Sequence, residues 1–467
     1  MEKWLSAALD YVPQWLEHQM RLSEQPGCVL AVALGDGTLV HESACGHADL
    51  AAGTKLTPRH RFRVASHSKT FTAAAIMKLR EQGRLKLDDR VGQHVAGLHP
   101  AVAQATLAQL LSHTAGLVRD GYDAGQWQDR RPFLDEAALR ADLAAGTTLE
   151  PNTRFKYSNH GYGLLGLVVE AVAGEPYANW VEREIVAASG LKHTRADMPA
   201  GGLTAFAAGH SSKLPLGHRV VIPGTNPTHV LAAATGFVST AGDLARFFGS
   251  LSPTAARSVL SVDSRREMAR RQWKDPYGSV ERWYGQGTIS GALGGWEWFG
   301  HSGAFQGTMS RTVCLPAQNV SISLITNAVD GPAQAWLDGV LHILQAFAAH
   351  GAPGTRSAAW GGRWWSLWGP FDFVPVGDKV LVANPNLLNP MMDASQIVPA
   401  PRKGRDGALS GRIMVSSGFG HHGEAARIEH DARGRPKEAW VGGTRLVSEA
   451  RARRELAARY TAASPPG

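Results

Sequence analysis

The chain has 467 residues, of which 44% are hydrophobic and 19% are charged. This composition excludes a disordered protein, and the length favours two or more packed units over one very large domain. The formal net charge of +8 is modest for this length, and basic residues are dense only at Arg451, Arg453 and Arg454. We interpret that run as a solvated helix face and expect no nucleic-acid partner. The positive balance instead favours a mild attraction for anionic substrates.

The chain begins with an amphipathic helix, predicted over residues 1–20. Charges throughout this segment distinguish it from a signal peptide, and no stretch reaches the length of a membrane-spanning helix. We therefore expect a cytoplasmic protein with no membrane partner, while an exported form that has lost its leader stays open.

Strands are expected next, at 28–34 and 38–42, and Asp36-Gly37 between them predicts the tight turn of a hairpin. A short strand at 61–64 leads into a helix at 70–82 that Gly83 closes. From there to about residue 250 the sequence is mostly helical. Helices are predicted at 107–111, 162–173, 177–188 and 239–248.

The strand signal returns at 308–315 and 320–326, followed by a helix at 333–349. An antiparallel sheet built from both chain ends, with a helical insertion between them, satisfies this order and predicts a mixed α/β (α+β) fold. Residues 351–355 are typical of a linker. The sequence therefore predicts a large domain at 1–350 and a small, mostly β domain at 356–467, whose core we assign to the tryptophans at 360–368.

The three cysteines are odd in number and lack metal-binding spacing, which argues against a disulfide framework and a zinc site. We interpret Cys28, Cys45 and Cys314 as buried thiols. The segment His421-His422-Gly423-Glu424 lacks a third ligand, so we interpret it as a solvated turn and expect no metal.

The strongest chemical signal is Ser66-His67-Ser68-Lys69, where a strand meets a helix. Three-residue spacing puts Ser66 and Lys69 on one helical face, and the free amides of the first turn can stabilise a developing oxyanion. A hydroxyl needs an adjacent base, and a partly desolvated lysine can serve. Such a motif also arises by chance, in which case Ser66 would only cap a helix.

Two further segments strengthen this hypothesis: Tyr157-Ser158-Asn159, and His301-Ser302-Gly303-Ala304 before a strand pair. Together the three segments resemble the serine β-lactamase and DD-peptidase superfamily, in its class C-like branch of esterases, D-aminopeptidases and DD-peptidases. The resemblance covers most of residues 25–345. It includes Pro26-Gly27-Cys28 and the segments at 110–117 and 236–244.

The resemblance implies that Ser66 is the acylated nucleophile, Lys69 its base or orienter, and Tyr157 a proton-exchange partner. It implies that Asn159 binds Lys69 and a substrate amide, and that the 301–304 segment is the strand edge on which substrate lies. Its members there are His301, Gly303 and Ala304, with the Ala304 and Ser66 amides forming an oxyanion hole.

The chemistry is coherent on its own terms, because a cation and a phenolate with unperturbed pKa values near ~10 stabilise each other when buried together. No cofactor or metal is required. Class C β-lactamases and many penicillin-binding proteins have lysine where this chain has His301, and a neutral imidazole attracts a substrate carboxylate less strongly. In this position the chain instead resembles the esterase and D-aminopeptidase members. The C-terminal domain loosely resembles lipocalin-like modules appended to some D-amino-acid peptidases.

We therefore expect a serine hydrolase that acts on a small-molecule or peptide substrate, such as a D-amino-acid peptide or amide. The alternatives are a carboxylesterase or acyltransferase, a β-lactamase, and a non-catalytic penicillin- or peptidoglycan-binding receptor. A nucleophile elbow at Ser302 is disfavoured because strand, not helix, is expected after it. His113 is interpreted as a structural loop residue, and Tyr122 and Trp127 as site wall or core. The oligomeric state is not predictable from the sequence.

Overall fold

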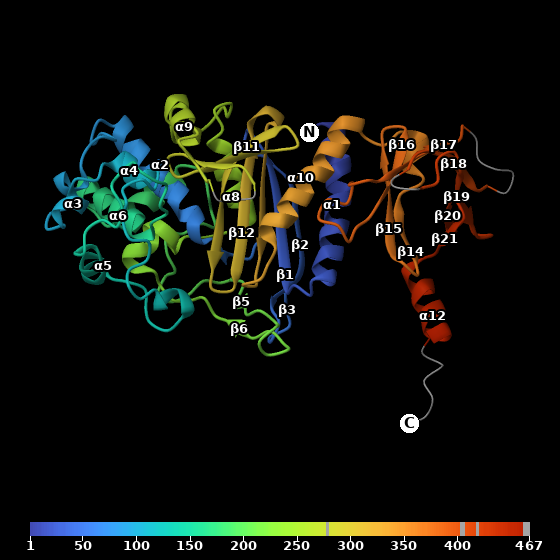
Figure 1. The fold of residues 1–467 in the computed structure, drawn as a ribbon, viewed down its shortest axis with the longest axis horizontal. Coiled ribbons are helices and arrows are strands. Elements are labelled where there is room, and N and C mark those ends of the chain that lie inside the picture. The colour runs from blue at the N-terminus through green and yellow to red at the C-terminus, as the bar shows by residue number, and fades with distance from the viewer. Residues whose placement is uncertain (277–279, 402–406, 417–419, 461–467) are drawn as a thin grey trace, which may run out of the picture. The chain divides into compact units, whose positions relative to one another are not determined.

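The computed structural model describes residues 1–276, 280–401, 407–416 and 420–460 (Figure 1). The chain forms two compact units. The larger one comprises residues 25–334, and the smaller one combines 1–24 with 335–467. The domain limits expected from the sequence, 1–350 and 356–467, stay a prediction.

The larger unit is built on a nine-stranded antiparallel sheet with the order β3-β2-β1-β13-β12-β11-β10-β9-β8. Strands from both ends of the unit meet in its middle, where Cys28 of β1 lies opposite Thr326 of β13. The expected sheet from both chain ends is thus confirmed. The strands are β1 (Gly27–Leu34), β2 (Leu39–Asp49), β3 (Thr54–Lys55), β8 (Trp273–Lys274), β9 (Arg282–Tyr284), β10 (Ile289–Leu293), β11 (Trp296–Phe305), β12 (Thr308–Leu315) and β13 (Val320–Thr326).

A helical region lies between β3 and β8 in sequence and sits beside the sheet (Figure 1). Its central helix, α2, is almost entirely buried, and α8 packs across β1 and β13. The helices are α2 (Ser68–Glu81), α3 (Pro100–Ala103), α4 (Leu107–Leu111), α5 (Glu136–Leu143), α6 (Asn159–Ala173), α7 (Tyr177–Val181), α8 (Ala241–Ser250) and α9 (Val262–Ala269).

Caps explain where two helices differ from the sequence prediction. Helix α6 begins at Asn159 rather than at Tyr162, because the Ser158 hydroxyl accepts the Gly161 amide at 2.9 Å. Helix α8 begins after Thr240, whose hydroxyl accepts the Asp243 amide. The helix expected over 177–188 ends as an α-helix at Val181 and continues as a π-helical segment, Glu182–Ala187.

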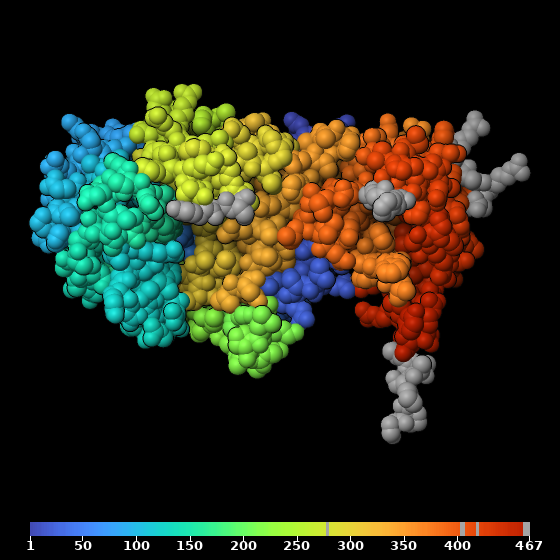
Figure 2. Space-filling model, in the orientation of Figure 1, coloured from blue at the N-terminus to red at the C-terminus, as the bar shows by residue number. Residues whose placement is uncertain are grey.

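Short strand pairs complete the larger unit. Strand β4 (Phe62–Arg63) pairs with β7 (Val238–Ser239), and this pair leads the chain into α2. Strands β5 (Gly209–His210) and β6 (Val221–Ile222) form a hairpin whose connection carries the exposed side chain of Leu214. Figure 2 shows this green segment as a protrusion.

The smaller unit contains a second antiparallel sheet of eight strands that pair in chain order, β14 to β21. A bridge between Trp365 and Val447 brings the two ends of the sheet together, so the sheet forms a nearly closed barrel. Its strands are β14 (Gly362–Ser366), β15 (Gly369–Val376), β16 (Lys379–Ala383), β17 (Ser395–Pro399), β18 (Leu409–Val415), β19 (Ala425–His430), β20 (Pro436–Val441) and β21 (Thr444–Leu446).

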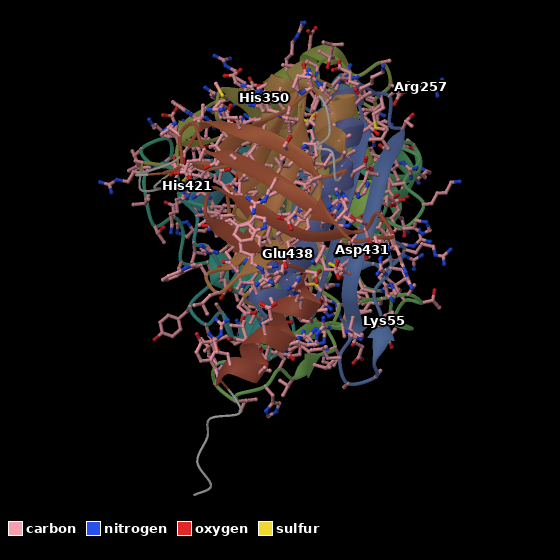
Figure 3. The ribbon with its side chains drawn as sticks, turned by 90° about the vertical axis from the view of Figure 1, so that its right-hand side faces the viewer. Lys55, Arg257, His350, His421, Asp431 and Glu438 are labelled. Atoms are coloured by element: carbon pink, nitrogen blue, oxygen red, sulfur yellow. The ribbon has the colours of Figure 1, made fainter. Side chains whose placement is uncertain are left out.

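Four helices belong wholly or mostly to this smaller unit: α1 (Lys3–Leu22), α10 (Ala333–His350), α11 (Thr355–Ala358) and α12 (Glu449–Tyr460). The basic run near the C-terminus lies on α12, where Arg451 pairs at 2.8 Å with Glu438 of β20, a residue marked in Figure 3. None of the helices in the described ranges combines the length and apolarity needed to cross a membrane.

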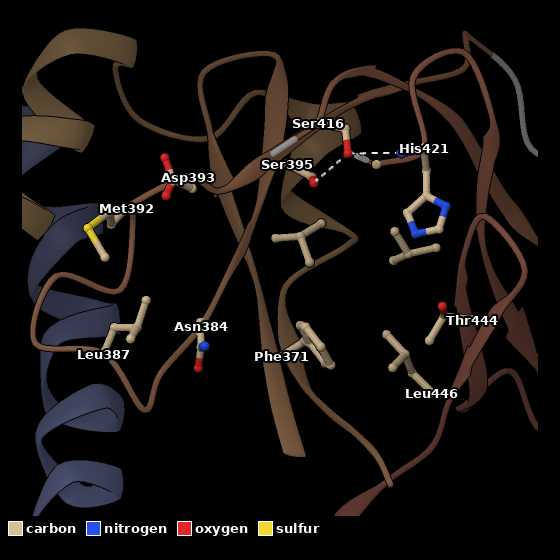
Figure 4. A pocket seen from close by; sticks show the side chains of 13 residues that line it. Phe371, Asn384, Leu387, Met392, Asp393, Ser395, Ser416, His421, Thr444 and Leu446 are labelled. Atoms are coloured by element: carbon tan, nitrogen blue, oxygen red, sulfur yellow. Dashed lines mark hydrogen bonds between the residues drawn. The ribbon is translucent and has the colours of Figure 1, made fainter. Parts of the chain in front are cut away.

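Apolar side chains of the strands and of the segment before them form the core of the smaller unit. Trp360 and Trp364 pack with Phe373 in this core, as the tryptophan cluster predicted. Trp368 differs: it lies in the connection between β14 and β15, with its side chain exposed. Figure 4 shows a pocket of about 370 Å³ in this unit, with Phe371 and Leu446 among its apolar lining residues.

None of the three cysteines forms a disulfide. Cys28 and Cys314 are buried as expected, whereas Cys45 is half-buried on β2.

A buried ion pair ties α1 to the barrel within the smaller unit. The Arg363 guanidinium donates to both oxygens of Asp372, at 2.6 and 2.7 Å, and the Tyr11 hydroxyl donates to the same carboxylate at 2.8 Å. The Asp372 side chain is 4% exposed. Without the guanidinium this carboxylate would stay buried with no ionic partner, which is strongly destabilising.

We expect Arg363→Met to lower the unfolding free energy of the smaller unit by about 3 kcal/mol. Urea unfolding followed by tryptophan fluorescence measures the change. Arg435→Met is the matched control, because its pair with Asp431 lies on the surface and contributes little. Equal unfolding midpoints for the two variants would contradict the role assigned to Arg363.

Candidate active site

Ser66 lies at a sharp turn between a strand and a buried helix. Strand β4 ends at Arg63, a 3₁₀ turn covers Ala65–His67, and α2 begins at Ser68. Ala65 has a φ of +48°, in the left-handed region that residues with a Cβ rarely adopt. Such backbone strain costs of order 1–3 kcal/mol and is typical of functional sites. The turn leaves Ser66 half-buried while its neighbours in sequence are buried.

The structure brings Ser66, Lys69 and Tyr157 together. The Tyr157 hydroxyl donates to Ser66 Oγ at 2.9 Å, and Lys69 Nζ lies 3.2 Å from the same oxygen. Tyr157 comes from the segment just before α6, so this meeting depends on packing between α2 and α6. The arrangement is that of a nucleophile in contact with two proton-exchanging groups.

Lys69 Nζ has two further partners that can only accept protons. It donates to Asn159 Oδ1 at 2.7 Å and to the Ala234 carbonyl at 2.8 Å. A neutral amine keeps two protons and one lone pair. Since the two carbonyl oxygens require those two protons, the proton lost on neutralisation is the one that faces Ser66. The lone pair of neutral Lys69 is therefore directed at the Ser66 hydroxyl.

Burial favours the neutral form of both groups. It lowers the pKa of Lys69, whose side chain is fully buried, well below the usual range. Burial also raises the pKa of Tyr157 above its ordinary value, although the hydrogen bond to Ser66 opposes this shift. The sequence argument expected an ammonium and a phenolate that stabilise each other. In the free site desolvation is the larger effect, and an amine beside a phenol is favoured.

Asp120 holds Asn159 in the orientation that Lys69 requires. Its Oδ1 accepts Asn159 Nδ2 at 2.6 Å and Trp127 Nε1 at 2.9 Å, while its Oδ2 accepts Arg119 Nε at 2.9 Å. Because the Asn159 amide nitrogen is held by the carboxylate, its oxygen faces Lys69. The sequence analysis missed Asp120. Its only sequence signal is its position just after the 110–117 segment.

The two residues considered for the site wall differ. Tyr122 has a fully exposed side chain. Trp127 packs edge-on against Phe133, as well as binding Asp120.

His113 supports the Tyr157 ring rather than acting on a reacting atom. Its ring lies 4.1 Å from that of Tyr157 between centroids, and its Nδ1 accepts the Ser158 amide at 3.1 Å. The proton of the neutral imidazole therefore sits on Nε2. Burial lowers the pKa of His113 well below its usual range, which keeps the ring neutral. These contacts agree with a structural role.

The third segment lies on β11, close to the turn that carries Ser66. A side chain at Gly303 would place its Cβ 2.2 Å from the Val64 carbonyl, so only glycine permits this approach. Strand β10 pairs with β11 no further than Gly300, while β12 covers the opposite edge as far as Phe305. One edge of β11 from 301 to 305 thus has no partner in the described sheet, and Ala304 is exposed there.

His301 is buried and does not open onto this edge. Its Nε2 lies 3.1 Å from the Tyr284 hydroxyl, and burial lowers its pKa well below the usual range. A neutral imidazole is the form that the sequence argument assumed. A direct contact between His301 and substrate stays a prediction, as does the oxyanion hole of the Ser66 and Ala304 amides.

Neither secondary signal gains support. Ser302 lies within β11 opposite Arg311, and the next element is β12, so the strand-to-helix turn of a nucleophile elbow is not formed. His421 lies 3.3 Å from Glu424 in an exposed ion pair. Among the described residues, no group of three or more His, Cys, Asp or Glu side chains is suited to a metal ion.

We expect the titration of Lys69 to respond in opposite directions to two neighbouring charges. The Asp120 carboxylate raises the Lys69 pKa and the Arg119 guanidinium lowers it. Asp120→Asn should therefore lower the pKa further, and Arg119→Gln should raise it. NMR of lysine labelled with ¹³C at Cε, with Lys69→Arg identifying the signal, measures both. Shifts of the same sign, or a Lys69 pKa near 10.4, would contradict this electrostatic account.

Known proteins resemble this chain over most of its larger unit. The family model described as Beta-lactamase matches residues 12–345. Penicillin-binding protein 4 of Amycolatopsis lactamdurans is 30% identical over 329 residues, which cover 65% of this chain and 81% of that protein. Protein flp of Staphylococcus aureus (strain MW2) is 28% identical over 183 residues, 38% of this chain. That match spans only 36% of flp.

Two solved structures extend the comparison. The octameric penicillin-binding protein homologue from Pyrococcus abyssi superposes with a TM-score of 0.64 at 21% identity, covering 94% of this chain and 99% of that one. This likeness shows the fold, including the barrel. A D-stereospecific amidohydrolase from Streptomyces sp. has a TM-score of 0.57 at 26% identity, covering 68% of this chain and 94% of that one. Since the family model covers well over half of its residues, the chain belongs to the beta-lactamase family.

Proposed function

We propose that this chain is a serine hydrolase that cleaves amide or ester bonds of small substrates through an acyl-enzyme on Ser66. D-amino-acid amides and short D-peptides are the proposed substrates. The observation that carries the proposal is the position of Ser66 Oγ, within hydrogen-bond distance of both Tyr157 Oη and Lys69 Nζ. A group that only caps a helix would need neither partner.

In the proposed acylation, Ser66 Oγ attacks the substrate carbonyl carbon and passes its proton to the lone pair of neutral Lys69. The amides of Ser66 and Ala304 stabilise the oxyanion. The bond from carbonyl carbon to leaving nitrogen or oxygen then breaks, and the leaving atom takes the proton of Tyr157. This step leaves an ester on Ser66, a Lys69 ammonium and a Tyr157 phenolate.

In the proposed deacylation, Tyr157 and Ser66 regain the protons that they lost during acylation. A water molecule gives one proton to the Tyr157 phenolate and attacks the ester carbonyl. The bond to Ser66 Oγ breaks, and Ser66 regains its proton from Lys69. The ammonium and phenolate that the sequence argument expected thus belong to the acyl-enzyme, where each stabilises the other. Lys69 Nζ lies 4.7 Å from the centroid of the Tyr157 ring, close enough for that stabilisation.

The substrate class rests on the likeness to a D-stereospecific amidohydrolase at 26% identity. Conversely, a neutral His301 offers no cation for the carboxylate of a β-lactam, so fast β-lactam hydrolysis is not expected.

A substrate panel tests the substrate class. We expect turnover of D-phenylalanine amide and D-phenylalanine p-nitroanilide to exceed turnover of their L-forms and of nitrocefin. Ser66→Ala should reduce every measurable rate by at least ~10³-fold, because nucleophile and base act as one unit. Turnover confined to p-nitrophenyl esters would favour a carboxylesterase, and rapid nitrocefin turnover would favour a β-lactamase. Full activity in Ser66→Ala would refute the mechanism itself.

Gly303→Ala tests the close approach of β11 to the Ser66 turn. The added Cβ would collide with the Val64 carbonyl, so the strand must move away from Ser66 and the Ala304 amide with it. We expect kcat to fall by ~10²-fold or more, the effect of losing one oxyanion-hole donor. Gly201→Ala is the matched control, since a Cβ there has open space around it. Circular dichroism checks folding; a kcat within twofold of the control would count against the proposed oxyanion hole.

A further inference from the structure

We propose that a cavity beside Tyr157 receives the leaving group of the substrate and selects for an uncharged, apolar and preferably aromatic one. This inference rests on the proposed function, because it assigns a specificity to the same site. The cavity measures about 190 Å³ and is lined from the β8–β10 edge of the sheet and from the segment before α6. Its aromatic and aliphatic lining residues are Phe155, Tyr157, Trp273, Trp283, Tyr284 and Ile289.

One face of the sheet forms the floor of the cavity. Trp273 of β8 lies directly opposite Tyr284 of β9, which in turn lies opposite Ile289 of β10. Residues opposite one another on adjacent strands project to the same face. The three side chains therefore make a continuous apolar row across three strands.

Aromatic rings from the segment before α6 form the wall. Phe155 lies 5.5 Å from Tyr284 between ring centroids, and Tyr157 meets Tyr284 edge-on at 6.3 Å. Tyr284 is buried, whereas Phe155, Trp273 and Ile289 stay partly exposed around the cavity. A row of partly exposed apolar side chains that enclose a cavity is a surface on which an apolar group gains free energy by being buried. The volume suits one ring, since a cavity of ~150 Å³ can hold benzene.

The charged side chains at the cavity form ion pairs with one another. Arg282 and Asp275, both lining residues, lie 2.9 Å apart as an ion pair. Lys274 and Glu281, which flank them in sequence, form a second pair at 3.1 Å. Because each of these cations is matched by an anion, the described residues around the cavity offer no net charge for a charged ligand. An uncharged ring is the occupant that this lining favours.

The position of Tyr157 indicates that the cavity binds the leaving group of the substrate rather than its acyl group. In the proposed mechanism Tyr157 gives its proton to the leaving atom, and Tyr157 is itself part of the cavity wall. The unpaired edge of β11 ends at Gly300, where Ile289 of the cavity floor takes over the pairing. A substrate extended along that edge thus reaches the cavity at one end. At the other end lies Phe305, in a separate cluster with Phe133.

Two substrates that share an acyl group but differ in leaving group test this proposal. D-phenylalanine anilide places a ring in the cavity, whereas D-phenylalanine amide releases only ammonia. We expect Trp273→Ala to lower kcat/KM for the anilide by at least ~10-fold, the range expected for burying a ring, and to change the amide by less than twofold. Ile289→Trp, which fills the cavity without leaving a void, should give the same selective loss. Trp273→Phe should restore most of it.

Trp368→Ala is the matched control, because it removes an exposed tryptophan from the other unit. Binding of 4-fluoroaniline, followed by ¹⁹F NMR on the Ser66→Ala variant, gives a readout that needs no turnover. We expect the ¹⁹F signal of 4-fluoroaniline to broaden when the Ser66→Ala variant is present. The signal should stay sharp with a variant that carries both Ser66→Ala and Trp273→Ala. No turnover of either substrate, with this binding intact, would defeat the proposed function and with it the leaving-group assignment, and would leave only a cavity that binds an apolar ring. Equal loss for both substrates in Trp273→Ala, or 4-fluoroaniline binding that ignores Trp273, would overturn the assignment.

Discussion

The Lys69 amine is fully removed from solvent, and the hydrogen-bond acceptors around it offset the free energy lost by that burial. An ammonium in such a place is disfavoured unless acceptors surround it. Asn159 and the Ala234 carbonyl supply two acceptors, and Ser66 Oγ is the third neighbour. The same two carbonyl oxygens determine where the lone pair lies once the amine is neutral. An exposed lysine is protonated at neutral pH and is not a base. Burial favours the neutral amine of Lys69, and the two hydrogen bonds direct its lone pair at the Ser66 hydroxyl.

The rest of the larger unit holds these partners in place. Helix α2 carries Lys69 and follows the turn that holds Ser66, and the capped start of α6 carries Asn159 next to Tyr157. Asp120 fixes the Asn159 amide, and His113 supports the Tyr157 ring. The glycine at 303 allows β11 to approach the strained turn at Ala65. Elements far apart in the sequence thus meet at one hydroxyl, which local propensity alone could not arrange.

Much of the fold could be predicted from the sequence, because apolar periodicity and turn residues indicate local structure. The β1–β2 hairpin, the α2 helix and the sheet from both chain ends follow from those patterns. Ser66, Lys69, Tyr157 and Asn159 were predicted as site residues because three spaced motifs resemble one superfamily, and the structure brings the four side chains together. Asp120 was missed because its role depends on a tertiary contact with Asn159, 39 residues away in the chain. Trp368 was misplaced because composition does not show which tryptophan lies at a hairpin tip.

The ionisation of the site was also beyond the sequence. Lysine and tyrosine have similar unperturbed pKa values, so their preferred pairing of charges depends on how much solvent each loses. Burial moves the two pKa values in opposite directions, which favours an amine and a phenol before acylation. In the proposed mechanism the charged pair forms when a substrate acylates Ser66, whereas the sequence predicted a mutually stabilising ammonium and phenolate without saying at which stage they form.

The central claim is that Ser66 is the nucleophile, and covalent labelling tests it most directly. A fluorophosphonate probe followed by peptide mass spectrometry should place one adduct on the peptide that contains Ser66. The adduct should disappear in Ser66→Ala and form far more slowly in Lys69→Arg, whose guanidinium cannot accept the serine proton. An adduct on Ser302, or equal labelling of the wild type and Ser66→Ala, would contradict the account.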